Sequence, residues 1–223
     1  MAREDSGNTS DSHGATGLAD PKAIDILTAE HWSLLSTRSL GSTEVFARAS
    51  IFAALLSGMV VALSFLAQAT EFGPETAMVS LVLIPVILFI GMTTFVRSVA
   101  LNQEDARWVT GMNLIRHAYV QINPALERYF VAGHEPEPAR GPLGQGARQR
   151  LRHLANSLTT TSGVIAALDS ILAGAIGSIT IGQLTDNAVV SIAVGSVVSI
   201  LAAAAHVSYA ARARETHSPA DAG

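Results

Sequence analysis

The sequence predicts an all-α integral membrane protein with four transmembrane helices in two hairpins, together with cytoplasmic amphipathic helices. Three observations support this fold class. The 223 residues are 49% hydrophobic and only 14% charged. The charges gather in a few polar stretches and are not spread as on a soluble surface. Four apolar segments of about 20 residues match the roughly 30 Å hydrocarbon thickness of a bilayer.

Two predicted segments precede the membrane. Residues 1–26 are rich in Gly, Ser and Asp and have few large apolar side chains. Such a segment cannot offset the entropy of ordering, so we expect a disordered tail. Residues 27–49 interleave apolar and polar side chains, which predicts a juxtamembrane amphipathic helix with Thr28 as its N-cap. Its Trp and Arg side chains would lie at the lipid headgroups.

The first predicted hairpin covers residues 50–97, with spans at 50–68 and 77–96 joined by a short acidic loop. In the first span, small residues recur every four positions and let another helix approach closely, so this face should be buried against protein. These residues are Ser50, Ala54, Gly58 and Ala62. The second span is apolar all round and is best suited to face lipid, with a kink expected at Pro85.

The connection between the hairpins combines a helix, residues 98–123, with a flexible linker rich in Gly and Pro, residues 124–147. Apolar side chains along 98–123 repeat at alternating steps of four and three, as in a helix seam. This seam could pack on the 27–49 helix, lie on the membrane, or pair with another subunit. The His and Glu residues of the linker lack metal-ligand spacing on a rigid element, so neither a metal nor a cofactor is expected.

The second predicted hairpin covers residues 148–207 and is followed by a C-terminal tail, residues 208–223. Three arginines precede its first span and should bind anionic lipid headgroups, namely Arg148, Arg150 and Arg152. Both spans carry small residues at helical spacing, which predicts close helix packing. These residues are Gly174 and Gly177 in the third span, and Ser191, Gly195, Ser199 and Ala203 in the fourth.

Asp169 is the only acidic residue in any of the apolar segments. An ionisable group inside a membrane is by default a functional hypothesis. A tight turn centred on Asp186 would bring Asp169 level with Ala203, one helical turn from His206. Asp169 could then be a protonated or hydrogen-bonded structural residue, or it could line a polar path. Further polar-path candidates share its depth or lie at the outer mouth, namely Ser57, Thr93, Thr94, Glu71 and Glu75.

The basic residues predict the orientation. None of the fourteen Lys and Arg residues lies in either of the two short hairpin loops. By the positive-inside rule, both termini and the long connection are therefore cytoplasmic, as expected for a multi-pass protein of a bacterial inner membrane. The many small-residue faces favour a homo-oligomer. The amphipathic helices could bind a cytoplasmic protein partner, whereas nucleic acid is not expected as a partner.

The sequence resembles two groups of known proteins. The runs EHWSLLSTRSLG (30–41) and EDARWVTGMNLIRHAY (104–119) resemble a group of bacterial four-span membrane proteins of unknown function, over about residues 27–129. The run ALLSG (54–58) is similar to the pore-lining first span of Orai calcium channels, which are four-span oligomers with cytoplasmic ends. Where that family has its selectivity-filter glutamate, this sequence has Leu66, so the resemblance does not imply calcium selectivity.

Two functional interpretations follow from the sequence. The first is an oligomeric pore or transport protein whose polar path includes Asp169, with Glu71 or Glu75 at an acidic outer mouth. The second is a non-transporting scaffold or accessory subunit that binds a partner through its cytoplasmic helices. An enzyme is not expected, because the only acid and base pair is Asp169 with His206, and neither a nucleophile nor a metal set accompanies it.

Overall fold

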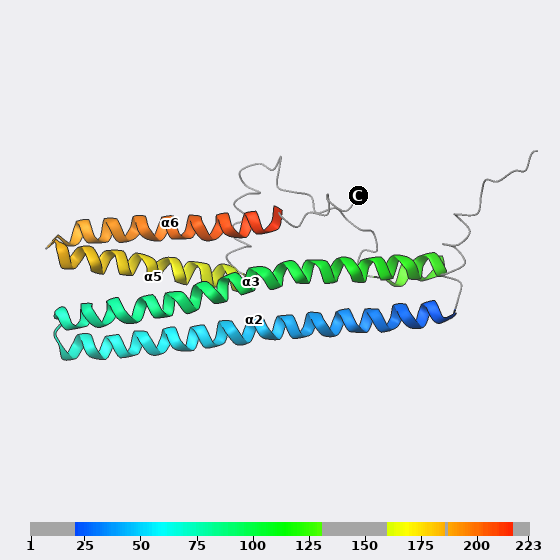
Figure 1. The fold of residues 1–223 in the computed structure, drawn as a ribbon, viewed down its shortest axis with the longest axis horizontal. Helices are drawn as coiled ribbons and strands as arrows, with labels where there is room; N and C mark the ends of the chain where they lie inside the picture. The colour runs from blue at the N-terminus through cyan, green and yellow to red at the C-terminus, as the bar shows by residue number, and fades with distance from the viewer. Residues whose placement is uncertain (1–20, 131–159, 186, 216–223) are drawn as a thin grey trace, which may run out of the picture. The chain divides into compact units, whose positions relative to one another are not determined.

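The computed structural model describes residues 21–130, 160–185 and 187–215. Its elements are α2 (Pro21–Ala69), α3 (Pro74–Ile122), the 3₁₀ helix η1 (Pro124–Tyr129), α5 (Thr161–Leu184) and α6 (Ala188–Glu215) (Figure 1). This described part of the chain contains no strand. All four α-helices are long and apolar enough to cross a membrane, which confirms the predicted fold class.

Helices α2 and α3 are longer than the sequence predicts. Each has 49 residues, about twice the length that a bilayer requires. The amphipathic helices expected at 27–49 and 98–123 are not separate elements, because each continues an apolar span without a break. No proline lies at either junction to interrupt the backbone hydrogen bonds. Thr28 consequently lies inside α2 and is not its N-cap.

Contacts divide the chain into two units. We call the first the α2–α3 unit, which contains residues 21–41 and 104–130. The second is the four-helix unit, which contains residues 42–103 of α2 and α3 together with α5 and α6. Each unit has its own packing and is described separately.

The α2–α3 unit pairs the start of α2 with the end of α3. Arg38 forms an ion pair with Asp105, with Nε 2.6 Å from Oδ1. Leu34 lies against Gly111, and Met112 of the predicted seam is buried. Of the three alternatives for this seam, the structure therefore has the one in which it packs on α2 of the same chain.

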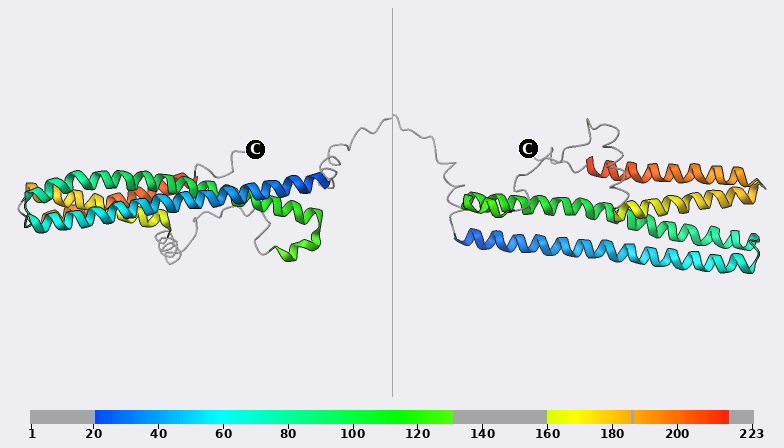
Figure 2. Two further views of the ribbon diagram at one scale, coloured as in Figure 1. Left: turned by 90° about the horizontal axis from the view of Figure 1, so that it is seen from below. Right: turned by 180° about the vertical axis from the view of Figure 1, so that it is seen from behind.

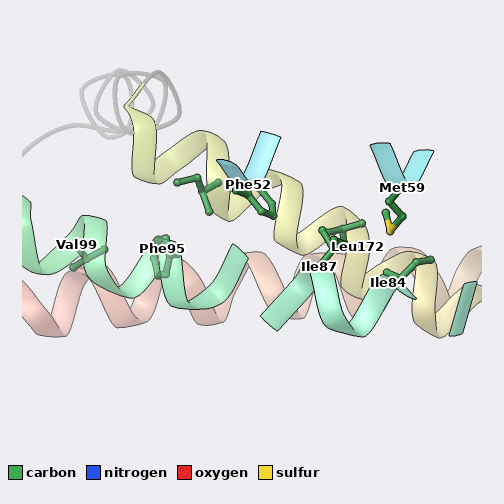
Figure 3. Close-up of a cluster of buried hydrophobic side chains, with 8 residues drawn as sticks. Phe52, Met59, Ile84, Ile87, Phe95, Val99 and Leu172 are labelled. Carbon is green, nitrogen blue, oxygen red and sulfur yellow. The ribbon is translucent and has the colours of Figure 1, made fainter. Parts of the chain in front are cut away.

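An apolar core joins the helices of the four-helix unit, and Figure 3 shows its side chains gathered between α2, α3 and α5. Its buried members are Phe52, Met59, Ile84, Ile87, Phe95, Val99, Ile165 and Leu172. Helix α6 adds Ala210 and Ala213, which are partly buried against the cluster. Lipid tails are as apolar as these side chains, so close packing rather than the hydrophobic effect must hold the spans together.

The second span is more enclosed than its composition predicts. In its most apolar window 33% of residues are buried, against 28% in α5 and 11% in each of α2 and α6. The expectation that this span faces lipid is therefore wrong for one side of the helix. Ile84 and Ile87 are buried, whereas Val82 and Val86 are exposed. A helix that is apolar all round gives no sequence signal for which side meets protein, and Pro85 lies on the exposed side.

Helices α5 and α6 lie side by side (Figures 1 and 2) and approach closely through glycine. A Cβ built on Gly195 would lie 2.8 Å from the Gly174 carbonyl oxygen and 2.8 Å from Ser178 Cβ. A Cβ built on Gly177 would lie 3.1 Å from Val198 Cγ2. Both predicted glycines of α5 thus face α6.

The small-residue stripe of α6 faces α5 over only part of its length. Ser191 and Gly195 are buried and Ser199 is half-buried, but Ala203 is exposed, contrary to the prediction. Positions four apart advance by more than one turn of 3.6 residues, so such a stripe drifts around the helix. One turn further along α6, the buried residue is His206.

The small-residue stripe of α2 is exposed in the single chain, so the prediction that protein buries this face now requires a second copy or another partner. The exposed residues are Ser50, Ala54, Gly58 and Ala62. A Cβ built on Gly58 would meet nothing within 4 Å. Helix α2 packs instead through Phe52 and Met59, because these larger side chains fill the space against α3 and α5.

Some predicted features lie outside the described residues. They are residues 1–20 and 216–223 of the predicted tails, most of the linker, the turn residue Asp186, and the headgroup arginines Arg148, Arg150 and Arg152. The rest of the two predicted tails, residues 21–26 and 208–215, is not disordered but helical, because α2 begins at Pro21 and α6 ends at Glu215.

The α5–α6 contact predicts a contrast between two substitutions. Gly195→Leu should lower the free energy of unfolding by about 2–3 kcal/mol, because its side chain would enter space held by Gly174 and Ser178. Val82→Leu should change it by less than about 0.5 kcal/mol, because Val82 is 66% exposed. Denaturant unfolding in detergent, followed by circular dichroism, measures both. Equal tolerance of the two substitutions would contradict the assignment of faces.

Candidate functional site

Asp169 lies in the third turn of α5 and is fully buried, with 0% of its side chain exposed. Its neighbours come from the three other helices of the four-helix unit: Phe52 from α2, Gly91 from α3 and His206 from α6. A Cβ built on Gly91 would collide with the Asp169 carboxylate and would lie 2.7 Å from Phe52 Cε2. The carboxylate therefore occupies space that exists only because residue 91 has no side chain.

His206 provides the only titratable side chain against Asp169 among the described residues. Its Nε2 lies 3.7 Å from Asp169 Oδ2, within the range of an ion pair but too far for a hydrogen bond. Its Nδ1 lies 2.8 Å from the carbonyl oxygen of Ala202. A carbonyl oxygen only accepts hydrogen bonds, so Nδ1 carries a hydrogen and donates it. In the neutral ring, Nε2 is then an acceptor that faces the carboxylate.

One added proton would make the two side chains complementary. Two acceptors that face each other repel, whereas one added proton converts either the carboxylate or the imidazole into a donor. The pair can therefore hold a proton on Asp169 or on His206. We call these two residues the Asp169–His206 pair.

Phe95 fixes the orientation of the imidazole. The two ring centroids are 4.6 Å apart and the rings meet edge to face, at 78°. This geometry is favourable for aromatic rings. The imidazole is thus held between Phe95 on α3 and the Ala202 carbonyl on its own helix, so rotation away from Asp169 would break two contacts.

The pair is buried but has few hydrogen-bond partners. Neither oxygen of Asp169 nor Nε2 of His206 has a hydrogen-bond partner in the described parts of the chain. Buried polar groups are usually hydrogen-bonded, and an unpartnered ionisable group is costly in an apolar environment. A group of this kind inside a membrane span points to function more strongly than to stability.

The other polar-path candidates lie away from the pair. Ser57 and Thr93 are exposed on the outside of the four-helix unit. Thr94 is buried, but its hydroxyl donates to the Ile90 carbonyl oxygen at 2.8 Å. Glu71 and Glu75 are exposed at the loop between α2 and α3. Of the seven predicted residues, the structure brings together only the two that form the pair.

Arg97 does not reach the pair either. It binds Glu44 of α2 through two contacts, with Nε 3.0 Å from Oε1 and Nη2 3.0 Å from Oε2. Arg48 also binds Glu44, at 2.9 Å. This bidentate geometry is the strong form of the arginine–carboxylate interaction. We call the end of the four-helix unit that carries Glu44, Arg48 and Arg97 the arginine end, and the opposite end the loop end.

Three residues of the site have no functional prediction from the sequence: Phe52, Gly91 and Phe95. For Gly91 a signal was present, since it is the only glycine in the span at 77–96. An isolated glycine in a long apolar span is a mark of close approach by another group. Phe52 and Phe95 carry no comparable signal, because large apolar residues are common in every span.

No protein-family model, curated protein or solved structure matches the chain. Residues 21–130, 160–185 and 187–215 contain no group of three His, Cys, Asp or Glu side chains that could hold a metal ion. The chemistry of the site must therefore be inferred from the geometry of the pair itself.

The fit between Gly91 and Asp169 can be tested with a matched pair of glycines. Gly91→Ala should cost about 1–3 kcal/mol of unfolding free energy, because the methyl group meets the carboxylate and the Phe52 ring. Gly182→Ala should be neutral or stabilising by up to about 1 kcal/mol, because its Cβ would meet only Ser191 Oγ, at an ordinary contact distance of 3.6 Å. In an Asp169→Ala background, Gly91→Ala should cost less. An unchanged cost there would contradict the contact.

Proposed function

We propose that this protein is a transport-type membrane protein whose Asp169–His206 pair binds and releases a proton within the bilayer. One observation carries the proposal. With Nδ1 of His206 committed to Ala202, the facing Nε2 and Oδ2 atoms at 3.7 Å are complementary only when a proton is added. The pair would alternate between a state with one proton and a state without it.

The energetics favour a functional role for the Asp169–His206 pair over a purely structural one. An apolar pair of similar size would pack in this core without the desolvation cost of two ionisable groups. Ionisable side chains inside spans commonly mark ion pathways and proton relays. The complete burial of Asp169 argues against an open aqueous pore through one chain and favours proton binding that is coupled to a movement of the helices.

The exposed face of α2 supports assembly into a homo-oligomer. Its small residues would let a helix of a second copy approach closely, and no helix of this chain, in the residues described, occupies that face. The first span would then lie at subunit contacts, as the resemblance to Orai channels implies. In the proposed orientation both termini lie in the cytoplasm of a bacterial cell.

A second candidate function is a membrane scaffold. The α2–α3 unit exposes large apolar side chains, with Trp32 at 65% and Leu40 at 69%. These side chains could bind a cytoplasmic protein, and the pair would then be a buried polar contact without a role in transport.

Proton flux separates the two candidates. In proteoliposomes with a pH gradient and a trapped pH-sensitive dye, wild-type protein should conduct protons above the background of empty liposomes. Asp169→Asn should return the flux to that background, because the amide cannot bind the proton. Glu75→Gln is the control, since this exposed residue lies near the loop and should leave the flux unchanged. Equal flux in wild type and Asp169→Asn would favour the scaffold.

Cysteine labelling tests the orientation, and the chain has no native cysteine to interfere. In intact cells, Glu71→Cys and Asn187→Cys should react with a membrane-impermeant maleimide, because both lie at the loop end. Ala125→Cys should react only after the cells are lysed. Labelling of Ala125→Cys in intact cells would reverse the proposed topology.

A further inference from the structure

One buried hydroxyl in the four-helix unit differs from all the others. Five serine or threonine side chains in the described chain are buried. Four of them donate to the backbone carbonyl of the preceding turn, namely Ser80, Thr94, Ser170 and Ser191. The fifth, Ser98, is 1% exposed, and its Oγ has no hydrogen-bond partner in the described residues. Because bonding to the preceding turn satisfies a buried hydroxyl locally, the orientation of Ser98 needs another explanation.

Ser98 lies on the face of α3 that carries the contacts of the pair. Gly91 touches Asp169, and Phe95 touches the His206 ring. Residues three, four and seven apart share one helix face, so Ser98 follows Gly91 and Phe95 on that face. It lies about 4.5 Å further along the helix axis than Phe95, towards the arginine end.

Polar contacts continue beyond Ser98 at the arginine end. Asn102 donates to Ser162 Oγ at 3.3 Å, which joins α3 to the start of α5. Gln103 donates to the Ala213 carbonyl oxygen at 2.6 Å, which joins α3 to the end of α6. These contacts form a polar layer about one helical turn from Ser98.

The route towards the loop end is longer, and the buried serine hydroxyls along it are bonded to their own helices. Asp169 lies about 10 Å along α5 from Ser162, but about 22 Å from Leu184 at the other end. On the loop side of Asp169, Leu172 and Ile87 are buried in the apolar core. Beyond them, Ser178 and Ser199 lie at the close contact between α5 and α6, and the buried Ser170 and Ser191 hydroxyls donate to the preceding turn of their own helices.

We propose that Ser98 relays protons between the Asp169–His206 pair and the arginine end. Its hydroxyl accepts a proton on an oxygen lone pair while its own hydrogen moves on, with water as the carrier on either side. The hydroxyl ends unchanged, and one proton has moved. This inference rests on the proposed function, because it requires that the pair binds a proton.

The other charged groups near this route are engaged elsewhere or lie at its end. Glu44 of α2 and Arg97 of α3 bind each other at the arginine end. Helix α5 contributes Asp169 and α6 contributes His206, with Arg212 near the end of α6. Within the described spans, one buried polar side chain between the pair and the polar layer thus lacks a hydrogen-bond partner, and it is Ser98.

The test follows the protonation of Asp169 directly. The full-length protein is reconstituted in vesicles and sorted for orientation with biotin on Glu71→Cys. A pH jump is applied outside, and infrared difference spectroscopy follows the carboxyl C=O band that Asp169→Asn removes. With the arginine end outside, Ser98→Ala should slow the change of this band at least about tenfold and leave its midpoint pH unchanged. Ser98→Thr keeps a hydroxyl and should retain most of the rate.

Thr94→Ala is the matched control, because it removes a buried hydroxyl that is already bonded to its own helix. A band that titrates at the wild-type rate in Ser98→Ala would overturn the relay and leave the proposed function standing. A response only to jumps at the loop end would overturn it equally. If no Asp169-dependent band changes with pH in the wild-type protein, the pair binds no exchangeable proton, and the proposed function fails together with the inference.

Discussion

The burial of one carboxylate constrains the whole four-helix unit. Asp169 is fully enclosed, and each of the other three helices provides what this requires. Helix α3 has a glycine where any side chain would collide with the carboxylate, and α6 provides an imidazole. Helix α2 covers the site with the ring of Phe52, which is 1% exposed. The helices are therefore positioned by packing around a polar group, although most of the residues that fill the core are apolar.

The sequence predicts the parts of this structure that depend on length, polarity and connectivity. Four apolar segments give four spans, and the short turn between the last two brings His206 to within about one helical turn of the depth of Asp169, without deciding which side of α6 it faces. It does not predict which side of an apolar helix meets protein, because lipid and a protein core accept the same side chains. For this reason the sequence of the second span does not indicate which of its sides is buried. The sequence likewise does not predict that the α6 stripe leaves the contact at Ala203, because this depends on how α5 and α6 cross.

Glycine illustrates the same limit more sharply. Gly58 belongs to a regular small-residue stripe, yet nothing lies within 4 Å of the position of its missing side chain. Gly91 belongs to no stripe, yet a side chain there would collide with Asp169. Regular spacing of small residues shows that another helix could approach closely. Whether one does depends on the residues that lie opposite. At Gly91 the partner is a single side chain, so no periodicity along α3 reveals the contact.

Besides joining α2 to α3, the arginine end bears on the proposed chemistry of the pair. A guanidinium next to Asp169 would pair with the carboxylate at every accessible pH, because arginine does not lose its proton in proteins. An imidazole can lose its charge near neutral pH, so only a histidine leaves the site able to release a proton. Arg97 lies about 9 Å along α3 from Gly91, the residue that touches Asp169. Its bidentate contact with Glu44 holds it away from the core. The ion pair that joins α2 to α3 thereby leaves His206 as the partner of Asp169, and in the proposed relay the same polar end is the shortest way out for a proton.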